Sequence, residues 1–216
     1  TLLRGAGPHH KNALLDGVRR VTGLSASFDG IDTSGQLDRD LITALLRAAG
    51  AEEAEMAAAV AEVARECQRS YCVDCVLDLS GFVCKGAREA LSHLRERGAV
   101  LGLVTGNLSE IGWRKMELAG LREFFSFGSF SEDGATRAEL ARLAVSRARD
   151  RALVPAGCRV SLIGDHVNDI QAARANGFQS IAVASGVMPA AELARHAPDI
   201  LLNNLTELDC RAIMGS

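Results

Sequence analysis

Beyond Cys84, short apolar segments of strand-like character alternate with amphipathic helical segments, and this alternation restricts the fold more than any other feature of the chain. We expect helices over 85–98, 108–119, 135–151, 168–176 and 190–197. We expect strands over 99–104, 124–130, 159–163, 180–184 and 200–202. Strands separated by single helices pair in parallel through right-handed crossovers. The sequence therefore predicts an α/β fold with a doubly wound, Rossmann-like parallel sheet.

The segment over 12–71 differs because its pattern is helical throughout. Apolar residues recur at helical spacing around Leu14 and Val18 and again over 41–46, and an alanine-rich stretch covers 52–69. The chain thus joins an all-helical segment to an alternating one.

Length and charge restrict the class of partner. A chain of 216 residues can bury about 70% of its unfolded surface. The formal charge of −3, from 24 basic and 27 acidic residues, gives no basic excess, so we expect no nucleic-acid partner. No apolar run approaches the roughly 18 to 20 residues that span a bilayer, and residues 1–11 lack the apolar segment of a secretion signal. We therefore expect a soluble, cytoplasmic protein with no membrane partner.

Four of the six cysteines lie close together in the sequence. Cys72 and Cys75 have the spacing of zinc ligands, and Cys67 and Cys84 would complete a four-thiolate set. However, no second Cys-x-x-Cys or His pair follows, and cytosolic thiols normally stay reduced. We expect buried free thiols near a domain junction, with zinc as the alternative.

The apolar run over 160–163 ends at Gly164-Asp165, and a second acid, Asp169, follows four residues later. A buried strand that ends in this way delivers its carboxylate to the crevice where open α/β sheets bind ligands. The two acids lie one helical turn apart and face one point, and Mg²⁺ is a cation that such a pair of hard carboxylates binds. The structural alternative is that Asp165 caps the next helix and Asp169 is a solvated acid of its first turn.

Two further groups suited to phosphate follow predicted strands. Thr105, Gly106 and Asn107 come after the strand that ends at residue 104, where a hydroxyl and backbone N–H groups at a helix start bind phosphate. Arg137 lies at the opening of the helix predicted over 135–151, where its guanidinium can fork onto phosphate oxygens. The ordinary alternatives are that Asn107 is only a helix N-cap and that Arg137 is a surface charge.

This order of a Thr, a cation at a helix start and Gly-Asp-x-x-x-Asp, each after its own strand, resembles the haloacid dehalogenase superfamily of phosphatases. The runs over 101–107 and 164–177 are similar to its phosphoglycolate phosphatase branch. The resemblance covers essentially the whole chain. It implies a Rossmann-like catalytic core over 1–11 and 82–216 and an inserted all-helical cap over 12–81.

The resemblance also assigns roles to the candidate residues. Thr105 and Arg137 would bind the phosphoryl group, with the N–H groups of Gly106 and Asn107, and the acids Asp165 and Asp169 would hold Mg²⁺. Lys115 is a weaker candidate for the cation, because it lies in mid-helix ten residues after Thr105.

The first motif of that superfamily, Asp-x-Asp-x-Thr, supplies a nucleophile and an acid/base. Thr1-Leu2-Leu3 is similar to the end of Asp-x-Asp-Gly-Thr-Leu-Leu, so both acids would precede Thr1 and lie outside this sequence. In the intact parent the first would form an aspartyl phosphate and the second would protonate the leaving alkoxide. The resemblance thus implies a Mg²⁺-dependent hydrolase of a small soluble phosphomonoester, such as phosphoglycolate or a sugar phosphate, and we expect the 216-residue chain alone to be inactive.

Two other functions stay open: a phosphomutase of the same fold, and a non-catalytic phosphate-binding domain that lacks the nucleophile. In the cap, residues 35–38 are similar to a family segment that commonly reads Gly-x-Thr-Asp, and we expect Asp38 to cap the helix over 39–49 rather than to touch substrate. His9 and His10 are expected to be exposed linker residues.

Overall fold

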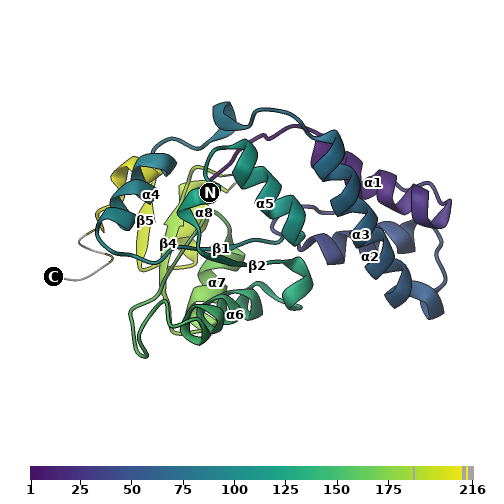
Figure 1. The fold of residues 1–216 in the computed structure, drawn as a ribbon. Coiled ribbons are helices and arrows are strands. Elements are labelled where there is room, and N and C mark those ends of the chain that lie inside the picture. Colours follow the sequence, from purple (N-terminus) through teal and green to yellow (C-terminus); the bar gives the residue numbers. More distant parts are fainter. Residues whose placement is uncertain (187, 211–212, 214–216) are drawn as a thin grey trace.

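The computed structural model describes residues 1–186, 188–210 and 213, and its helical lobe stands beside a sheet-containing core (Figure 1). The helices are α1 (His9–Thr22), α2 (Asp38–Ala48), α3 (Met56–Asp74), α4 (Ala87–Glu96), α5 (Ser109–Leu118), α6 (Arg137–Asp150), α7 (Val167–Ala175) and α8 (Ala190–Arg195). The strands are β1 (Gly102–Val104), β2 (Phe127–Ser129), β3 (Ser161–Gly164), β4 (Gln179–Val183) and β5 (Ile200–Leu202).

The helical lobe consists of α1, α2 and α3, which pack on one another through their apolar faces. Leu14, Ile42 and Val63, one from each helix, are fully buried in this lobe. Helix α1 ends at Gly23, whose left-handed φ of 73° suits glycine, and whose N–H donates to Arg19 O. The helical periodicity of residues 12–71 therefore arises from a three-helix core.

The pairs among strands β1–β5 are parallel, as the alternation predicted, and an isolated antiparallel bridge joins Leu3 to Val83. Strand β1 pairs with β2 so that Val104 lies beside Ser129, and β4 lies between β3 and β5. Helices α6 and α7 contact the strands, and Figure 1 shows them on one side of the strands with α4 and α5 on the other. The α/β doubly wound fold class is confirmed. Two strands are shorter than predicted: β1 begins at Gly102 rather than at residue 99, and β2 lies between 3₁₀ turns over 122–124 and 131–133.

Strands β1 and β3 are not paired, so the described strands form two separate sheets. A cavity of about 410 Å³ lies between them and is lined by both strands and by Thr1, Leu2 and Leu3. The amino-terminal segment is held by backbone hydrogen bonds, from Cys84 N to Leu2 O (2.9 Å) and from Arg4 N to Phe82 O (2.9 Å). The core therefore contains a cavity between β1, which ends just before Thr105, and β3, which ends just before Asp165.

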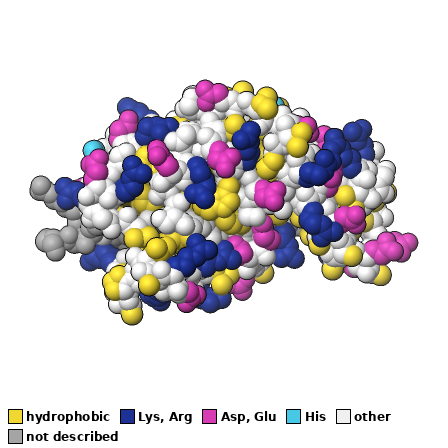
Figure 2. Space-filling model, viewed as in Figure 1, with side chains coloured by type: hydrophobic (Ala, Val, Ile, Leu, Met, Phe, Trp, Pro, Cys, Tyr) yellow, Lys and Arg dark blue, Asp and Glu magenta, His cyan; other side chains and the backbone are white. Residues whose placement is uncertain are grey.

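The surface is mixed in charge. On the face shown in Figure 2, basic and acidic side chains are interspersed, with no continuous basic area. Within the described ranges, no helix is both long enough and apolar enough to span a bilayer.

Candidate active site

Polar side chains from several elements meet where β1 and β3 end. Thr105 follows β1 directly and Asp165 follows β3, and the carboxyl ends of parallel strands meet at one edge. Arg137 enters from the first turn of α6, and Asp169 from the first turn of α7. All four side chains line the 410 Å³ cavity, together with Asn107. The structure thus brings the predicted phosphate and metal residues to one place.

Asp169 and Arg137 are neighbours in this site. Arg137 Nε lies 3.4 Å from Asp169 Oδ1, and both side chains are mostly buried. Burial raises the pKa of the Asp169 carboxyl; the Arg137 charge opposes the rise, and the Asp165 charge adds to it. Arg137 Nε has no hydrogen-bond partner among the described residues, so a buried donor faces the site.

Helix α7 is not capped by Asp165, the residue that the structural alternative to metal binding assigned to this role. His166 is the N-cap, its Nδ1 accepts from Asn168 N (3.2 Å), and Asp169 Oδ2 accepts from His166 N (3.3 Å). The alternative that Asp165 caps this helix is therefore wrong, and its carboxylate accepts from Thr1 Oγ1 at 2.7 Å. Asp169 lies in the first turn as expected, but it is buried and completes the capping box.

The two acids fit Mg²⁺ better than a softer metal. No group of three or more His, Cys, Asp or Glu residues within the described part of the chain forms an all-protein metal site. Mg²⁺ needs only one or two carboxylates when water and substrate phosphate complete its shell. Glycine leaves room around both acids, since a Cβ at Gly164 would overlap Asp169 and one at Gly186 would overlap Asp165.

Most backbone N–H groups in the segment after Thr105 already have hydrogen-bond partners within the protein. Asn107 N donates to Thr105 Oγ1 (3.2 Å), and the N-cap of α5 is Leu108 rather than Asn107. The N–H groups of Ser109 and Glu110 donate to side chains, Glu132 Oε1 and Gln68 Oε1 respectively. Among the described residues, the Gly106 N–H has no hydrogen-bond partner. The donors available to an anion are therefore fewer than the sequence suggests.

Two expectations for residues of the helical lobe are wrong. Asp38 is the first residue of α2, its N-cap is Leu37, and its carboxylate instead accepts from Leu108 N at 2.9 Å. His9 and His10 are not exposed linker residues: both are half-buried in α1, and His10 Nε2 lies 3.0 Å from Asp38 Oδ2. No local pattern signals these roles, because the partners are remote in sequence.

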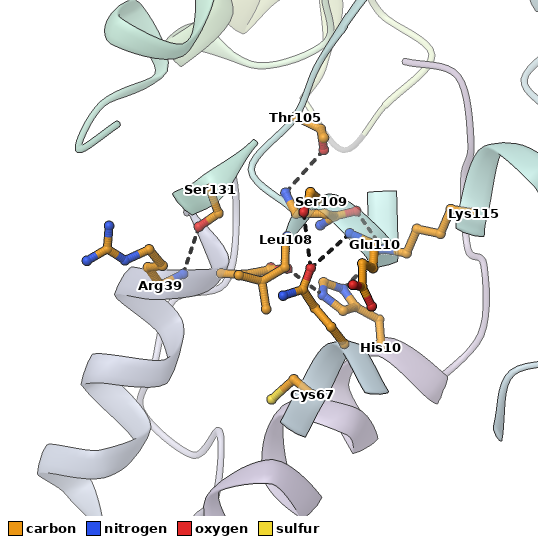
Figure 3. Close-up of polar contacts among 12 residues, drawn as sticks. His10, Arg39, Cys67, Thr105, Leu108, Ser109, Glu110, Lys115 and Ser131 are labelled. Carbon is orange, nitrogen blue, oxygen red and sulfur yellow. Dashed lines mark hydrogen bonds and ion pairs between the residues drawn. The ribbon is translucent and has the colours of Figure 1, made fainter. Parts of the chain in front are cut away.

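Lys115 also lines the cavity, but its ammonium group contacts residues at the boundary with the helical lobe. Its Nζ lies 3.2 Å from His10 Nδ1 (Figure 3). The same Nζ donates to Asn107 Oδ1 at 2.8 Å. The segment between α1 and α2 contacts the start of α7 nearby, where Asn168 Nδ2 donates to Gly35 O at 3.1 Å. The helical lobe therefore touches both strand ends that carry the candidate residues.

The four cysteines that lie close together in the sequence are free thiols, and Cys84 packs in the core with α4, β4 and β5, away from Cys67 and Cys75 in the helical lobe. Cys67, Cys75 and Cys84 are buried and Cys72 is half-buried. Burial raises the pKa of the Cys67 thiol to about 12, so this thiol stays protonated at neutral pH.

A family model for haloacid dehalogenase-like hydrolases matches residues 6–177. The chain belongs to the haloacid dehalogenase-like hydrolases. This confirms the family that the strand-end motifs indicated.

Several known proteins are similar to this haloacid dehalogenase-like hydrolase. Pyrophosphatase PpaX from Bacillus velezensis is 29% identical over 126 residues, which are 56% of this chain and 55% of PpaX. PpaX from Bacillus pumilus is 28% identical over 131 residues, 59% of this chain and 57% of that protein. The chain thus spans little more than half the length of the curated relatives that it matches.

Solved structures share the fold at low identity. A protein from Clostridium acetobutylicum described as a predicted phosphatase superposes with a TM-score of 0.67 at 18% identity, covering 100% of this chain and 94% of that one. The β-phosphoglucomutase of Clostridium difficile gives a TM-score of 0.67 at 14% identity, covering 98% and 91%. At these identities the likeness establishes the fold alone.

Proposed function

We propose that this haloacid dehalogenase-like hydrolase is a Mg²⁺-dependent phosphomonoester hydrolase that acts on a small soluble phosphate through an aspartyl-phosphate intermediate. The observation that carries the proposal is the convergence of Thr105, Arg137, Asp165 and Asp169 on one cavity at the strand ends. A hydroxyl and a guanidinium are phosphate ligands, and two adjacent carboxylates are Mg²⁺ ligands.

Each residue has a role in this chemistry. The Thr105 hydroxyl, the Gly106 N–H group and the Arg137 guanidinium would hold the phosphoryl oxygens in the geometry for in-line transfer, whereas the Asn107 N–H already donates to Thr105 Oγ1. Asp165 and Asp169 would hold Mg²⁺, which supplies positive charge beside the transferring group. Arg137 would offset the remaining charge, since its Nε forms no hydrogen bond among the described residues although it lies 3.4 Å from Asp169 Oδ1.

The nucleophile is proposed to come from a further strand between β1 and β3. The separation of the two sheets and the cavity between them support this proposal, as does Thr1, which lies at the strand-end edge beside Asp165. A carboxylate at the end of that strand would attack phosphorus as the bond to the leaving oxygen breaks, and a second acid would protonate that oxygen. Water would then release phosphate and restore the carboxylate.

The substrate class is proposed as phosphoglycolate or a sugar phosphate, from the resemblance of residues 101–107 and 164–177 to the phosphoglycolate phosphatase branch. The PpaX relatives make inorganic pyrophosphate the competing substrate. The fold likeness to β-phosphoglucomutase leaves a phosphomutase as the alternative reaction, and a non-catalytic phosphate-binding domain as the alternative class.

The first experiment reads the codons upstream of Thr1 and expresses the protein with and without the residues that they encode. We expect Asp-x-Asp-Gly before Thr1, Mg²⁺-dependent hydrolysis of p-nitrophenyl phosphate by the longer protein, and none by residues 1–216 alone. A panel of phosphoglycolate, hexose phosphates and pyrophosphate then compares kcat/KM. Equal turnover by both proteins would overturn the proposed nucleophile, and turnover in excess chelator would overturn the proposed metal.

A further inference from the structure

Three polar groups, the buried Asp38 and the half-buried His10 and Lys115, lie where the helical lobe meets the core, and the proposed chemistry gives them no task. His10 Nε2 is 3.0 Å from Asp38 Oδ2, and His10 Nδ1 is 3.2 Å from Lys115 Nζ. Asp38 is 1% exposed. His10 comes from α1, Asp38 from α2 and Lys115 from α5, so the cluster joins two helices of the lobe to one of the core.

The contacts assign the protonation states. Lys115 has only donors, so His10 Nδ1 accepts from the ammonium, and the Nε2–H of a neutral imidazole donates to Asp38. Burial lowers the pKa of His10, and the Lys115 charge lowers it further against the opposing effect of Asp38. Burial raises the pKa of Asp38, but contacts with His10, Lys115 and Leu108 N–H bring it below its ordinary value. The cluster thus pairs one ammonium with one carboxylate through a neutral histidine.

This cluster holds each of the three residues that follow Thr105. Asp38 N donates to Gly106 O at 2.8 Å, and Lys115 Nζ donates to Asn107 Oδ1 at 2.8 Å. Asp38 Oδ2 accepts from Leu108 N at 2.9 Å. The position of Thr105 depends on the same segment, because Asn107 N donates to Thr105 Oγ1.

We propose that Lys115 and Asp38 are positioning residues for the Thr105 hydroxyl and the Gly106 N–H, and that His10 links Lys115 to Asp38. The packing of the helical lobe on the core then fixes the position of residues 105–108, the segment that binds the phosphoryl group in the proposed function. The kinetic consequence rests on the proposed phosphatase function, but the structural one does not. A displacement of about 1 Å at such a segment is enough to lower turnover about 10²-fold.

The kinetic test compares Lys115→Met, Lys115→Arg and the matched control Lys85→Met in the full-length enzyme, with p-nitrophenyl phosphate. Lys85 is a solvent-exposed residue on the surface of the sheet-containing core. We expect Lys115→Met to lower kcat about 10- to 100-fold with a smaller change in KM, because Arg137 still binds the ground-state phosphate. Lys115→Arg should recover part of the loss, and Lys85→Met should match the wild type.

The pH profile separates positioning from a merely structural role. Burial lowers the pKa of Lys115 to about 8, while Asp38 and Cys75 oppose the shift. The charge of Lys11 contributes to the lowered pKa of His10. Above pH 8 the Lys115 bond to Asn107 loses its charge assistance, so kcat of the wild type should decline. In Lys115→Arg the decline should move to higher pH, because arginine stays protonated.

A readout independent of turnover uses the backbone ¹H–¹⁵N signals of Gly106, Asn107 and Leu108. In the wild type they should titrate near pH 8, and in Lys115→Met this titration should vanish. The inference would be overturned if Lys115→Met had the kcat, the pH profile and the three backbone signals of the wild type.

If the wild-type enzyme hydrolyses no phosphate, the proposed function fails, and the titration of the three backbone signals alone decides this inference. If Lys115→Met does not fold, Asp38→Asn takes its place, with displacement of the same three signals expected and unchanged signals overturning the inference.

Discussion

The Cα of Gly17 on α1 faces the Sγ of Cys67 on α3, so closely that a Cβ on Gly17 would overlap that sulfur. The carbonyl oxygen of Val63 would lie 3.3 Å from the same Cβ. Helices that approach this closely depend on a small residue at the crossing. Gly17 therefore sets how near α1 and α3 pack in the helical lobe.

Replacing Gly17 with alanine should overpack this crossing. We expect Gly17→Ala to lower the free energy of unfolding by about 1 to 3 kcal/mol, measured by urea denaturation. Because the clash is mainly with sulfur, Gly17→Ala/Cys67→Ala should be more stable than Gly17→Ala alone. Gly81→Ala is the control, since a Cβ there meets nothing within 4 Å. Equal losses for Gly17→Ala and Gly81→Ala would show that the crossing tolerates the methyl group.

The cation of the site is tested through Arg137. Arg137→Ala should lower turnover by about 10² to 10³, as expected when one charge-stabilising donor is lost. Arg137→Lys should retain more activity, because it keeps the charge but not the planar fork. Arg142→Ala, an exposed arginine of the same helix, is the control and should leave turnover unchanged. If Arg137→Ala is silent while Lys115→Ala is not, Lys115 is the cation instead.

The metal is tested through Asp165. A neutral amide is a poorer ligand for a hard cation, so Asp165→Asn should weaken Mg²⁺ binding and lower turnover together. Calorimetric titration with Mg²⁺ measures the first effect and hydrolysis of an aryl phosphate the second. Asp74→Asn, an exposed acid at the end of α3, should change neither. Unaltered Mg²⁺ affinity in Asp165→Asn would remove this residue from the metal site.

The cysteines predict a pattern of reactivity. Cys72 and Cys158 are half-exposed, whereas the other four thiols are buried, so an aromatic disulfide reagent should modify these two first in the native protein. Metal analysis of protein purified without chelator should find no bound zinc. One zinc per chain that is lost on Cys72→Ser would replace the free-thiol interpretation with a zinc site.

The strands and the residues at their ends could be predicted because each depends on local pattern. An apolar run that stops at Gly164-Asp165 or at Thr105 specifies a buried strand and a polar end within a few residues. Helix α7 begins at Val167, one residue from the predicted start. The capping residue was harder to predict, because His166 rather than an acid takes this role.

The cluster at the lobe boundary could not be predicted in this way. His10 meets Asp38 across 28 positions and Lys115 across 105, so neither contact leaves a periodic or motif signal. Asp38 also imitates an N-cap in sequence, since an acid just before an apolar helical run usually has that role. Only tertiary packing turns its carboxylate toward Leu108 N.

The last prediction concerns Asp133, which ties α6 to β2. Its Oδ2 accepts from Arg147 Nη1 (2.7 Å) and from Phe130 N (2.8 Å), and Arg147 Nη1 also donates to Gly128 O (2.7 Å). The hydrogen bond with Arg147 lowers the pKa of Asp133 in the folded state, although burial opposes it. A lowered pKa means that the stabilisation is present at neutral pH and is lost as the pH falls through the folded-state pKa.

Asp133→Asn should therefore lower the free energy of unfolding by about 1 to 2 kcal/mol at pH 7, because the pair is partly exposed. The gap from wild type should begin to narrow below about pH 4, near the unfolded-state pKa of an aspartate, and close further as the pH falls through the lowered folded-state pKa. Urea denaturation between pH 3 and 7 measures this, with the exposed Asp150→Asn as control; a gap of constant size over that range would contradict the ion-pair explanation.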